Sequence, residues 1–313
     1  MLLRVTSAAM KRVTLVALML LAACGSDSGA EKTKHALIIG LDGVRPDALQ
    51  QASTPRLGAL IASGTVSYDA FAGGVLGEET EQPTFSGPGW SSILTGVWTD
   101  KHGVKLNVFD DANFDEYPHF FARVREKNPD VYLSSFVTWA PINESILASA
   151  EADAVFTWDD PSDSAGGDLA VTAAVVAHMA AATPDVVFVH LDQVDHQGHA
   201  FGYGPEIPEY VDAIENVDSQ IGEMLDAVRA RPTHASEDWL VVVITDHGGI
   251  GKGHGGESDE ERTIFMIASG GAASAGASVS PGPGHTAVAP TVMTHLGLSI
   301  ELGWGYASEP FGL

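Results

Sequence analysis

The sequence predicts a three-layer α/β fold in which helices cover both faces of a mainly parallel, doubly wound sheet. Short, continuous apolar runs recur along the chain, as expected of strands that are buried on both faces. Helical patterns lie between these runs, and alternating strands and helices are typical of parallel crossover connections. The expected strands are residues 35–41, 131–137, 186–191, 240–244 and 264–268.

Two helices are readable from the spacing of their apolar residues. Side chains three or four residues apart fall on one face of a helix, which can then pack on the sheet. The first helix is indicated by Leu169, Thr172, Val175, Val176 and Met179, and the second by Val211, Ile214, Val217, Ile221, Leu225 and Val228. The Gly-, Ala-, Ser- and Pro-rich residues 269–284 are instead typical of a loop.

The chain before the first strand has the pattern of an export signal. Met10-Lys11-Arg12 begins a short basic region, and an apolar stretch of eleven residues, 13–23, follows it. Eleven residues are too few to span a bilayer as a helix, and basic, apolar and small residues in this order form a secretory signal. The signal is clearer from Met10 than from Met1, so Met10 is an alternative start of translation.

The only cysteine of the chain, Cys24, ends the segment Leu-Ala-Ala-Cys at residues 21–24. This segment resembles a bacterial lipoprotein box, in which Cys24 becomes the lipidated first residue; an ordinary cleaved signal is the alternative. We therefore expect a lipoprotein-type signal peptide at 1–23, a flexible tether at 24–34 and one folded domain at 35–313. The resemblance implies an exported protein, anchored to a membrane through Cys24 and facing the periplasm or the cell exterior.

The composition limits the classes of partner. With 45% hydrophobic residues, the 313-residue chain can bury one large core. It has 41 Asp and Glu residues against 16 Lys and Arg residues, for a formal net charge of −25. Because no extended basic surface can neutralise a nucleic-acid backbone, polymeric DNA or RNA is not an expected partner. Clustered carboxylates are, however, the ligands that divalent cations require.

Carboxylate and imidazole side chains follow three of the expected strands. Asp42 comes directly after the first strand, and Asp246 and His247 come directly after the fourth. After the third strand, Asp195 and His199 are four residues apart, so one helical turn can direct both at one ion. Each signal alone is as readily a turn or a structural histidine. Together they predict a cation site, because ligands of such sheets gather at the carboxyl ends of the strands.

A further histidine, His254, lies in a glycine-rich segment before the last expected strand. Mixed carboxylate and imidazole ligands without cysteine fit zinc best, with manganese or iron as alternatives. The candidates can form two sets of about three ligands, and two ions about 4 Å apart can hold the attacking and leaving oxygens of a phosphoryl displacement. The domain is therefore expected to be a metal-dependent hydrolase that acts on a small phosphate ester.

One serine is a candidate nucleophile. Ser86 is followed by Gly-Pro-Gly and by a short apolar run that ends at Gly96. Pro88 can open a helix, and the N-terminal end of a helix favours both an alkoxide and a phosphate. Taken alone, the segment also fits a serine that only caps a helix. Thr84 is a nearby alternative nucleophile.

Read together, these segments resemble the nucleotide pyrophosphatase/phosphodiesterase branch of the alkaline phosphatase superfamily. The resemblance runs from about His35 to the C-terminus and implies an alkaline-phosphatase-like fold and hydrolysis of phosphodiesters or nucleotide pyrophosphates. The motifs that carry it are, in order, Asp42-Gly43, Thr95-Gly96, His102-Gly103, Asp195-X-X-Gly198-His199, Asp246-His247-Gly248 and Gly253-His254-Gly255.

The resemblance also implies a role for each candidate residue. One ion would be bound by Asp42, Ser86, Asp246 and His247, and the other by Asp195, His199 and His254. Ser86 would attack phosphorus in line, and water would then hydrolyse a phosphoseryl intermediate, with net retention at phosphorus. His285 is an alternative to His254 as the last ligand.

The nucleophile segment departs from related families at two positions. The phosphodiesterase branch usually has Thr at the position of Ser86 and Asn at that of Gly89, where the Asn amide contacts a phosphate oxygen. Sulfatases need Arg at the position of Trp90, which makes a sulfatase a disfavoured alternative. Gly89 and Trp90 are candidate substrate-binding residues, since Trp90, like Trp139 and Trp158, can stack on a flat group.

Two further alternatives remain open. A phosphomonoesterase should bind its dianionic phosphate through Arg or Lys, and no Arg lies close to Ser86 in the sequence. Arg45 and Lys101 are candidates to approach from other loops. The other alternative, from a different class, is a surface binding lipoprotein that keeps the fold without turnover.

Overall fold

The computed structural model describes residues 31–150 and 152–313, and Lys32–Leu313 form one compact unit. The predicted signal peptide and its Cys24 lie outside the described residues. The described strands form one eight-stranded sheet with the order β4-β3-β5-β1-β6-β7-β2-β8. These strands are β1 (Thr33–Leu41), β2 (Gly64–Phe71), β3 (Leu133–Val137), β4 (Ala154–Thr157), β5 (Val186–Leu191), β6 (Glu237–Ile244), β7 (Thr263–Gly270) and β8 (Ala277–Ser278).

The sheet is mainly parallel, as predicted. All neighbours from β4 through β6 pair in parallel, and only β7 runs antiparallel to its neighbours β6 and β2. Each of the five expected apolar runs forms a strand. The predicted first residue of β6, Leu240, lies too far along the chain. The strand begins at Glu237, a charged residue that is buried against Arg231. The short edge strands β4 and β8 and the neighbouring β2 were missed, since their residues are less continuously apolar.

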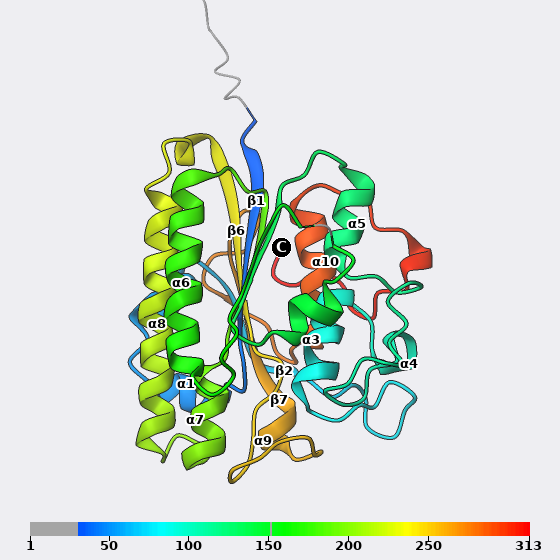
Figure 1. Ribbon diagram of the computed structural model, residues 1–313, viewed down its shortest axis with the longest axis vertical. Helices are drawn as coiled ribbons and strands as arrows, with labels where there is room; N and C mark the ends of the chain where they lie inside the picture. The colour runs from blue at the N-terminus through cyan, green and yellow to red at the C-terminus, as the bar shows by residue number, and fades with distance from the viewer. Residues whose placement is uncertain (1–30, 151) are drawn as a thin grey trace, which may run out of the picture. The chain divides into compact units, whose positions relative to one another are not determined.

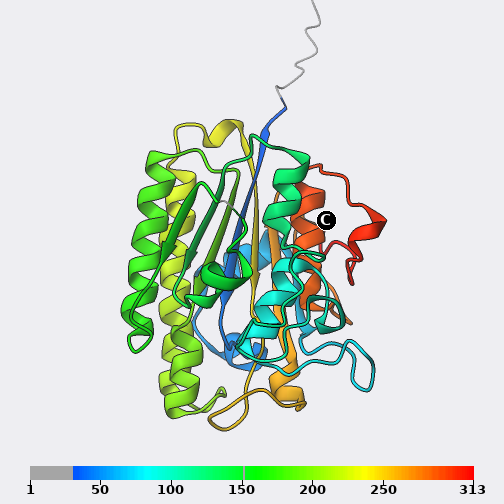
Figure 2. The same cartoon turned by 45° about the vertical axis from the view of Figure 1, so that its right-hand side comes forward.

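Helices cover both faces of the sheet, so the domain has three layers (Figures 1 and 2). One layer contains α1 (Pro46–Gln51), α2 (Pro55–Ala62), α6 (Ser164–Ala181), α7 (Gln193–Phe201) and α8 (Pro208–Arg229). The other contains α3 (Ser86–Thr95), α4 (Thr99–His102), α5 (Phe120–Lys127) and α10 (Val288–His295). The shorter elements are α9 (Asp259–Arg262), a π-helical turn η1 (Ile142–Ile146), and the 3-10 turns η2 (His234–Ser236), η3 (His285–Ala287) and η4 (Leu302–Trp304).

The alternation of side chains along β1 explains why both layers have a hydrophobic core. Successive side chains of a strand point to opposite faces. Leu37 and Ile39 pack in the core under α6 and α8, whereas Ala36 and Ile38 pack in the core under α3 and α10. The central strands are thus buried on both faces, as the continuous apolar runs indicated.

The two predicted helices are confirmed as α6 and α8, with one wrong assignment. Leu169 of α6 is 61% exposed, because Val171 takes its place in the core. Within the described residues, α6 is also the one helix that is long and apolar enough to cross a membrane. It packs on β3, β5 and α8.

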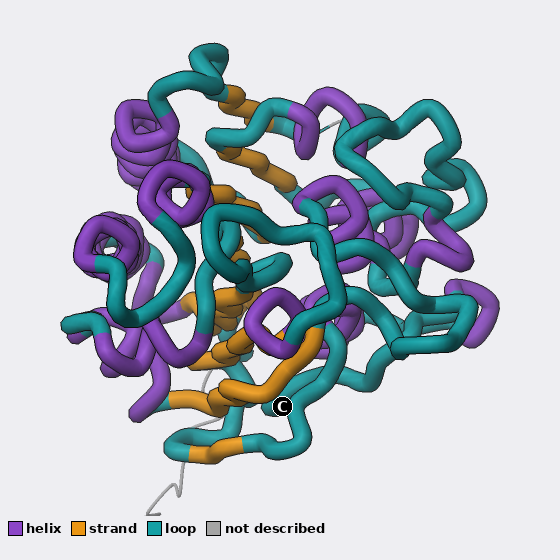
Figure 3. The backbone as a smooth tube through the Cα atoms, turned by 90° about the horizontal axis from the view of Figure 1, so that it is seen from below, coloured by secondary structure: helices purple, strands orange, loops and turns teal. Residues whose placement is uncertain are grey.

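The strand order brings the predicted ligands to one edge of the sheet. The adjacent strands β5, β1 and β6 run in the same direction, so the segments that follow them begin side by side. Figure 3 looks at the domain from below, with the row of strands between the two groups of helices and loops in front of it.

Candidate metal centre

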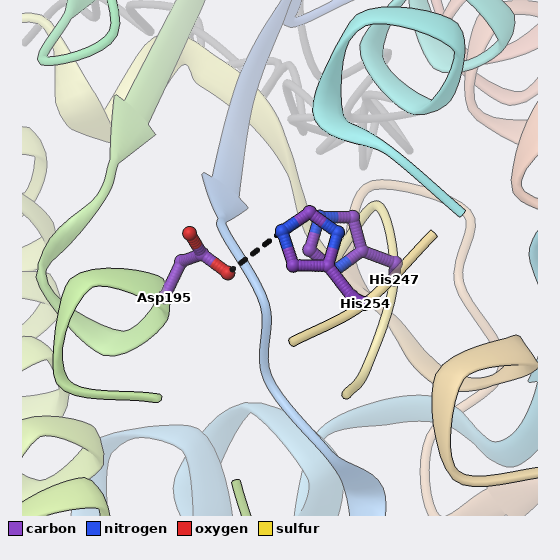
Figure 4. Close-up of side chains that lie close together, drawn as sticks. All are labelled: Asp195, His247 and His254. Atoms are coloured by element: carbon purple, nitrogen blue, oxygen red, sulfur yellow. Dashed lines mark ion pairs between the residues drawn. The ribbon is translucent and has the colours of Figure 1, made fainter. Parts of the chain in front are cut away.

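Five of the predicted ligands form two overlapping groups at the carboxyl ends of β1, β5 and β6. The ligand atoms of Asp42, Asp246 and His247 all lie within 4.8 Å of one another, and so do those of Asp195, His247 and His254. Figure 4 shows the carboxylate of Asp195 facing the overlapping rings of His247 and His254. His247 therefore lies between the two sets that the resemblance implied, with its ring stacked on that of His254 at 3.8 Å.

The sixth ligand, His199, joins the second group through helix α7. Asp195 lies in the first turn of α7 and His199 in its last, so the helix directs both to one side, as predicted. The Nε2 atom of His199 lies 3.3 Å from Oδ2 of Asp195 and 3.1 Å from Nε2 of His254. The hydrogen bond to Asp195 raises the pKa of His199 to about 9. A proton can thus occupy this place, and a cation would have to displace it.

Main-chain carbonyl groups fix the tautomer of all three imidazoles. In each case Nδ1–H donates to a carbonyl oxygen: His199 to Lys252 at 3.1 Å, His247 to Gly248 at 2.8 Å and His254 to Thr84 at 2.8 Å. A carbonyl oxygen can only accept, so each Nδ1 carries a proton. The Nε2 atoms of His247 and His254 therefore turn their lone pairs toward the centre, and Nε2 of His199 does so once the proton that it shares with Asp195 is displaced. Metal-binding histidines are commonly oriented in this way.

Two carboxylate oxygens at the centre are buried without a hydrogen-bond partner. They are Oδ1 of Asp42 and Oδ2 of Asp246, in side chains that are each 1% exposed. They lie 3.4 and 3.2 Å from Nε2 of His247, whose pKa burial lowers to about 3. A neutral imidazole lone pair facing two carboxylate oxygens is unfavourable unless a proton or a metal cation lies among them. Carboxylate and imidazole donors in this arrangement fit a divalent metal such as zinc.

Burial and mutual repulsion of carboxylates act on the pKa values of these groups. Burial, followed by the charges of Asp246, Asp195 and Asp192, raises the pKa of Asp42 well above its ordinary value. Burial and the charge of Asp195 do the same for Asp246. For Asp195, burial acts in the same direction, but the hydrogen bond from His199 and the nearby histidines lower its pKa overall. A divalent cation would neutralise this concentration of negative charge.

Each ligand carboxylate has one oxygen engaged by a neutral donor. Tyr203 Oη donates to Oδ1 of Asp195 at 2.5 Å, and the Gly43 N–H group donates to Oδ1 of Asp246 at 3.3 Å. Each carboxylate is therefore oriented to offer its other oxygen to the centre. Asp42 is oriented in the same way, but two donors hold its engaged oxygen.

Trp90 and His190 hold Oδ2 of Asp42. Trp90 Nε1–H donates to it at 2.9 Å and His190 Nε2–H at 3.0 Å. The assignment of Trp90 to substrate binding was wrong, because the side chain is fully buried against Phe188 and His190. His190 was not among the predicted residues, and its only signal in the sequence is that it interrupts the apolar run of β5. Asp42, His190 and Asp192 form a third group of metal-ligand types, but the Nε2 proton of His190 is already donated to Asp42.

Ser86 faces the same centre from the first residue of α3. Phe85 is the N-cap of this helix and makes no side-chain cap, so the interpretation of Ser86 as a simple cap was wrong. Ser86 Oγ lies 3.4 Å from Nε2 of His247. Thr84, the alternative nucleophile, instead donates to Gly256 O at 2.9 Å and accepts from Gly255 N at 3.0 Å. Its hydroxyl therefore holds the loop that carries His254.

Gly89 has a packing role rather than a role in binding. A Cβ atom at this position would lie 2.9 Å from Cβ of Asp246, so only glycine lets α3 approach the metal centre this closely. An asparagine amide instead reaches the cleft from another loop. Asn107 Oδ1 accepts from the Gly87 N–H group at 2.7 Å, which leaves its Nδ2 group to donate to a ligand. Asn107 was missed because nothing in its local sequence relates it to Ser86.

The alternative last ligand, His285, lies beside the backbone of Asp246 but outside these groups. Its buried ring stacks on Trp98 at 4.8 Å, and it belongs to none of the metal-ligand groups among the described residues. His254 therefore remains the better candidate.

A cleft of about 850 Å³ opens beside the centre. It is lined by Ser86, Asp195, His199 and His254, by Asn107, and by residues that follow β3 and β4. Arg45 and Lys101 do not line it: Arg45 pairs with Asp47, and Lys101 donates to the carbonyl group of Gly305.

A three-layer αβα domain with carboxylate and imidazole side chains gathered at the carboxyl ends of its parallel strands is the arrangement expected of the alkaline phosphatase superfamily. A model of the family "type I phosphodiesterase / nucleotide pyrophosphatase" matches residues 36–168 and 138–251. The chain belongs to this family.

Individual proteins show the same relationship. The chain is 25% identical over 248 residues to bis(5'-adenosyl)-triphosphatase ENPP4 of Bos taurus, covering 73% of this chain and 50% of that protein. The chain thus spans about half the length of this protein and of ectonucleotide pyrophosphatase/phosphodiesterase family member 7 of Mus musculus, and less of other curated relatives. Among solved structures, murine ectonucleotide pyrophosphatase/phosphodiesterase 5 in complex with AMP has a TM-score of 0.64 at 13% identity, over 90% of this chain and 97% of that chain. A 2-O GAG sulfatase has a TM-score of 0.70 at 14% identity, over 90% and 73%. These two structures show the fold alone.

Proposed function

We propose that the protein is a metal-dependent hydrolase of phosphodiesters or nucleotide pyrophosphates, with Ser86 as its nucleophile. The observation that carries the proposal is the pair of buried, unpartnered carboxylate oxygens of Asp42 and Asp246 beside Ser86. The family and the names of its relatives support the same reaction class.

The residues present can hold two divalent ions, for which zinc is our first choice. Asp42, Ser86, Asp246 and His247 would hold one, and Asp195, His199 and His254 the other. When bound, the ions supply positive charge that stabilises the serine alkoxide and the leaving oxygen. The shared position of His247 between the two groups is consistent with two closely spaced ions.

The chain's own groups then position the reaction. Ser86 Oγ loses its proton to solvent and attacks phosphorus, while the bond from phosphorus to the ester oxygen breaks. Asn107 Nδ2 and the N-terminal end of α3 face a non-bridging oxygen of the phosphate. Water then attacks the phosphoserine from the vacated side, the bond to Ser86 Oγ breaks, and the configuration at phosphorus is retained overall.

The lining of the cleft favours diesters over monoesters. A terminal phosphate carries two negative charges and calls for Arg or Lys. No Lys or Arg lines the cleft in the described part of the chain, and Arg45 and Lys101 are engaged elsewhere. A single remaining negative charge on a diester needs less compensation.

The test compares three substrates of the metal-loaded protein: bis-p-nitrophenyl phosphate, p-nitrophenyl phosphate and p-nitrocatechol sulfate. We expect the diester to turn over fastest, and Ser86→Ala to abolish its turnover. Ser91→Ala is the matched control, because Ser91 lies on the same helix and its hydroxyl only donates to the carbonyl group of Gly87. Mass spectrometry of quenched reactions should find phosphate on the peptide that contains Ser86. Turnover that survives in Ser86→Ala would remove Ser86 from the mechanism.

We also propose export and lipidation at Cys24, which would anchor the domain to a membrane through the tether of residues 24–34. Cys24→Ser should move the protein from the membrane fraction to the soluble fraction of its host without changing the turnover of a purified sample. Retention in the membrane fraction would contradict the anchor.

A further inference from the structure

Helix α7, which carries Asp195 and His199, begins without a side-chain cap of its own. The first backbone N–H groups of a helix have no partner within the helix. The side chain of the N-cap residue, Asp192, makes no capping hydrogen bond and instead accepts from Ser164 Oγ at 2.6 Å. The start of α7 therefore depends on a group from elsewhere in the fold.

Asp168 of the neighbouring helix α6 supplies this group. Helices α6 and α7 lie in the same layer of the domain (Figure 1). Oδ1 of Asp168 accepts from the Asp192 N–H group at 2.8 Å, and Oδ2 accepts from the Gln193 N–H group at 2.9 Å. The Asp168 side chain is buried, and in the part of the chain that the structure describes no Lys, Arg or His nitrogen lies within 4.0 Å of it. Its negative charge is thus compensated by the N-terminal end of α7 rather than by an ion pair.

A second contact ties Asp168 to the sheet. Thr138 comes directly after β3, and its N–H group donates to the carbonyl group of His190 in β5 at 3.2 Å. The hydroxyl group of Thr138 donates to Oδ1 of Asp168 at 2.7 Å. Asp168 thus holds the start of α7 in place relative to the carboxyl ends of β3 and β5.

The position of α7 determines whether two of the predicted ligands reach an ion. Asp195 lies two residues after Gln193, in the first turn of α7, and His199 lies one turn later. Distances in a metal site are held to within about 0.2 Å. A small shift at the start of α7 would therefore move both side chains away from the place where His254 can complete the site.

We propose that Asp168 is a positioning residue for one of the two ions, because it caps α7 from a neighbouring helix and so directs Asp195 and His199 to that ion. The inference rests on the proposed function, since it requires that these two residues bind an ion together with His254. The other set of ligands contains no residue of α7, so its ion should be held without Asp168.

Asp218 provides a matched control, because it caps a helix without predicted ligands in the same way. This residue of α8 is 2% exposed, and its two oxygens accept from the N–H groups of Arg56 at 3.1 Å and Leu57 at 2.8 Å, at the start of α2. The N-cap residue of α2, Thr54, makes no side-chain cap of its own. No residue of α2 lines the cleft.

The experiment titrates Zn²⁺ into the metal-free protein at pH 8, in competition with a chromophoric chelator. Burial raises the pKa of Asp168 to about 7, so its carboxylate is charged at this pH. Wild-type protein should bind two equivalents tightly. In Asp168→Asn the affinity for one equivalent should fall about 10- to 100-fold, as is usual when a group that supports metal ligands is lost. The side-chain amide has only one oxygen, so its NH2 group would face a backbone N–H group.

Reference variants identify the affected ion. His199→Ala removes a ligand from the site on α7 and should weaken the same equivalent, so a variant with both substitutions should still bind the other equivalent with wild-type affinity. Asp218→Asn should change both affinities by less than about twofold, because distant sites without shared partners act independently.

The results separate this inference from the proposed function. Unchanged affinities in Asp168→Asn, equal losses for both equivalents, or the same loss in Asp218→Asn would overturn the positioning role. If Asp168→Asn does not fold, Thr138→Val takes its place: it removes only the hydroxyl group that ties Asp168 to the sheet, and it should weaken the same equivalent about threefold through the loss of one hydrogen bond. Unchanged metal binding in folded Thr138→Val would then overturn the inference. Wild-type protein that binds no metal tightly would overturn the proposed function as well.

Discussion

Strand β6 has a buried carboxylate near each end, and the two differ in their hydrogen-bond partners. Glu237, the first residue of the strand, is fully partnered: Arg231, Thr233 and Trp239 all donate to its two oxygens. Burial acts to raise its pKa, but the hydrogen bonds from these three residues outweigh burial and lower the pKa to about 2. Glu237 is thus held as an anion by the protein itself.

Asp246, beyond the other end of β6, has one engaged oxygen and one with no hydrogen-bond partner. Burial and the charge of Asp195 raise its pKa well above the ordinary value. The same strand therefore ends in a closed ion pair on one side and in an open set of ligands on the other. A buried charge that the fold neutralises is a structural feature, whereas one left open indicates a ligand.

The largest effect on turnover is expected when the carboxylate of Asp246, at the open end of β6, is replaced by a neutral amide. Asp246→Asn should lower turnover of bis-p-nitrophenyl phosphate on the order of 10³-fold, because a metal ligand is lost. In the metal-free protein the same change should raise the free energy of unfolding by about 1–2 kcal/mol, because it removes one carboxyl group from a buried set of carboxyl groups that repel one another. Steady-state kinetics and urea denaturation with a chelator measure the two effects. A metal-free variant less stable than the wild type would make Asp246 a structural residue like Glu237.

The second prediction concerns the closed end. Glu237→Gln should cost about 3–5 kcal/mol of unfolding free energy, because Arg231 is left buried without its counter-charge. Metal content and kcat of the folded fraction should not change. The control is Asp226→Asn, which breaks the exposed pair of Asp226 with Arg229 on α8 and should cost less than about 0.5 kcal/mol. Loss of activity in folded Glu237→Gln would mean that the two ends of β6 are coupled.

The residues at the open end of β6, around Asp246, were easier to predict from the sequence than Glu237 and Arg231 at the closed end. Asp42, Asp246 and His247 each follow a continuous apolar run, and strand direction alone then brings them to one edge. Glu237 and Arg231 were missed because charged residues next to an apolar run look like a solvated turn. Their burial depends on helix α6, whose last carbonyl groups accept from Arg231.

The support around the ligands was predictable to a smaller extent. Trp90 was correctly placed beside the nucleophile but given the wrong role, because a sequence does not show which way a side chain points. His190 and Asn107 act through contacts with Asp42 and Gly87, which lie 148 and 20 residues away along the chain. No local pattern reports such contacts. The ligands could be predicted because they come directly after strands. The residues that orient them could not, because their positions depend on the packing of distant segments.

Acid pH should destabilise the folded protein by protonating Glu237 at the closed end of β6. The pKa of Glu237 is lowered from 4.5 to about 2 in the folded protein, so its contribution to stability is present above pH 4.5 and is lost as the pH falls through about 2. The difference corresponds to about 3 kcal/mol. Urea denaturation between pH 5 and pH 2 measures it in the metal-free protein, with Glu237→Gln as the reference that lacks this carboxylate. Identical slopes of unfolding free energy against pH in both proteins would contradict the assignment.

The smallest effect tests how the open end is oriented. Trp90→Phe keeps an aromatic ring against Phe188 but removes the Nε1–H group that donates to Oδ2 of Asp42. Metal affinity should fall about tenfold, as is usual when a hydrogen-bond partner of a metal ligand is removed, with little change in kcat at saturating metal. Competition with a chromophoric chelator measures the affinity.

Trp98→Phe is the matched control for this measurement, because Trp98 is also buried but stacks on Phe71 and His285 rather than on a ligand. Equal losses of affinity in both variants would attribute the effect to packing. A loss confined to Trp90→Phe would mean that donors orient the carboxylate at the open end as they do at the closed end. The two ends of the sheet would then differ in one respect only: at the metal centre, the fold engages one oxygen of the carboxylate and leaves the other for the cation.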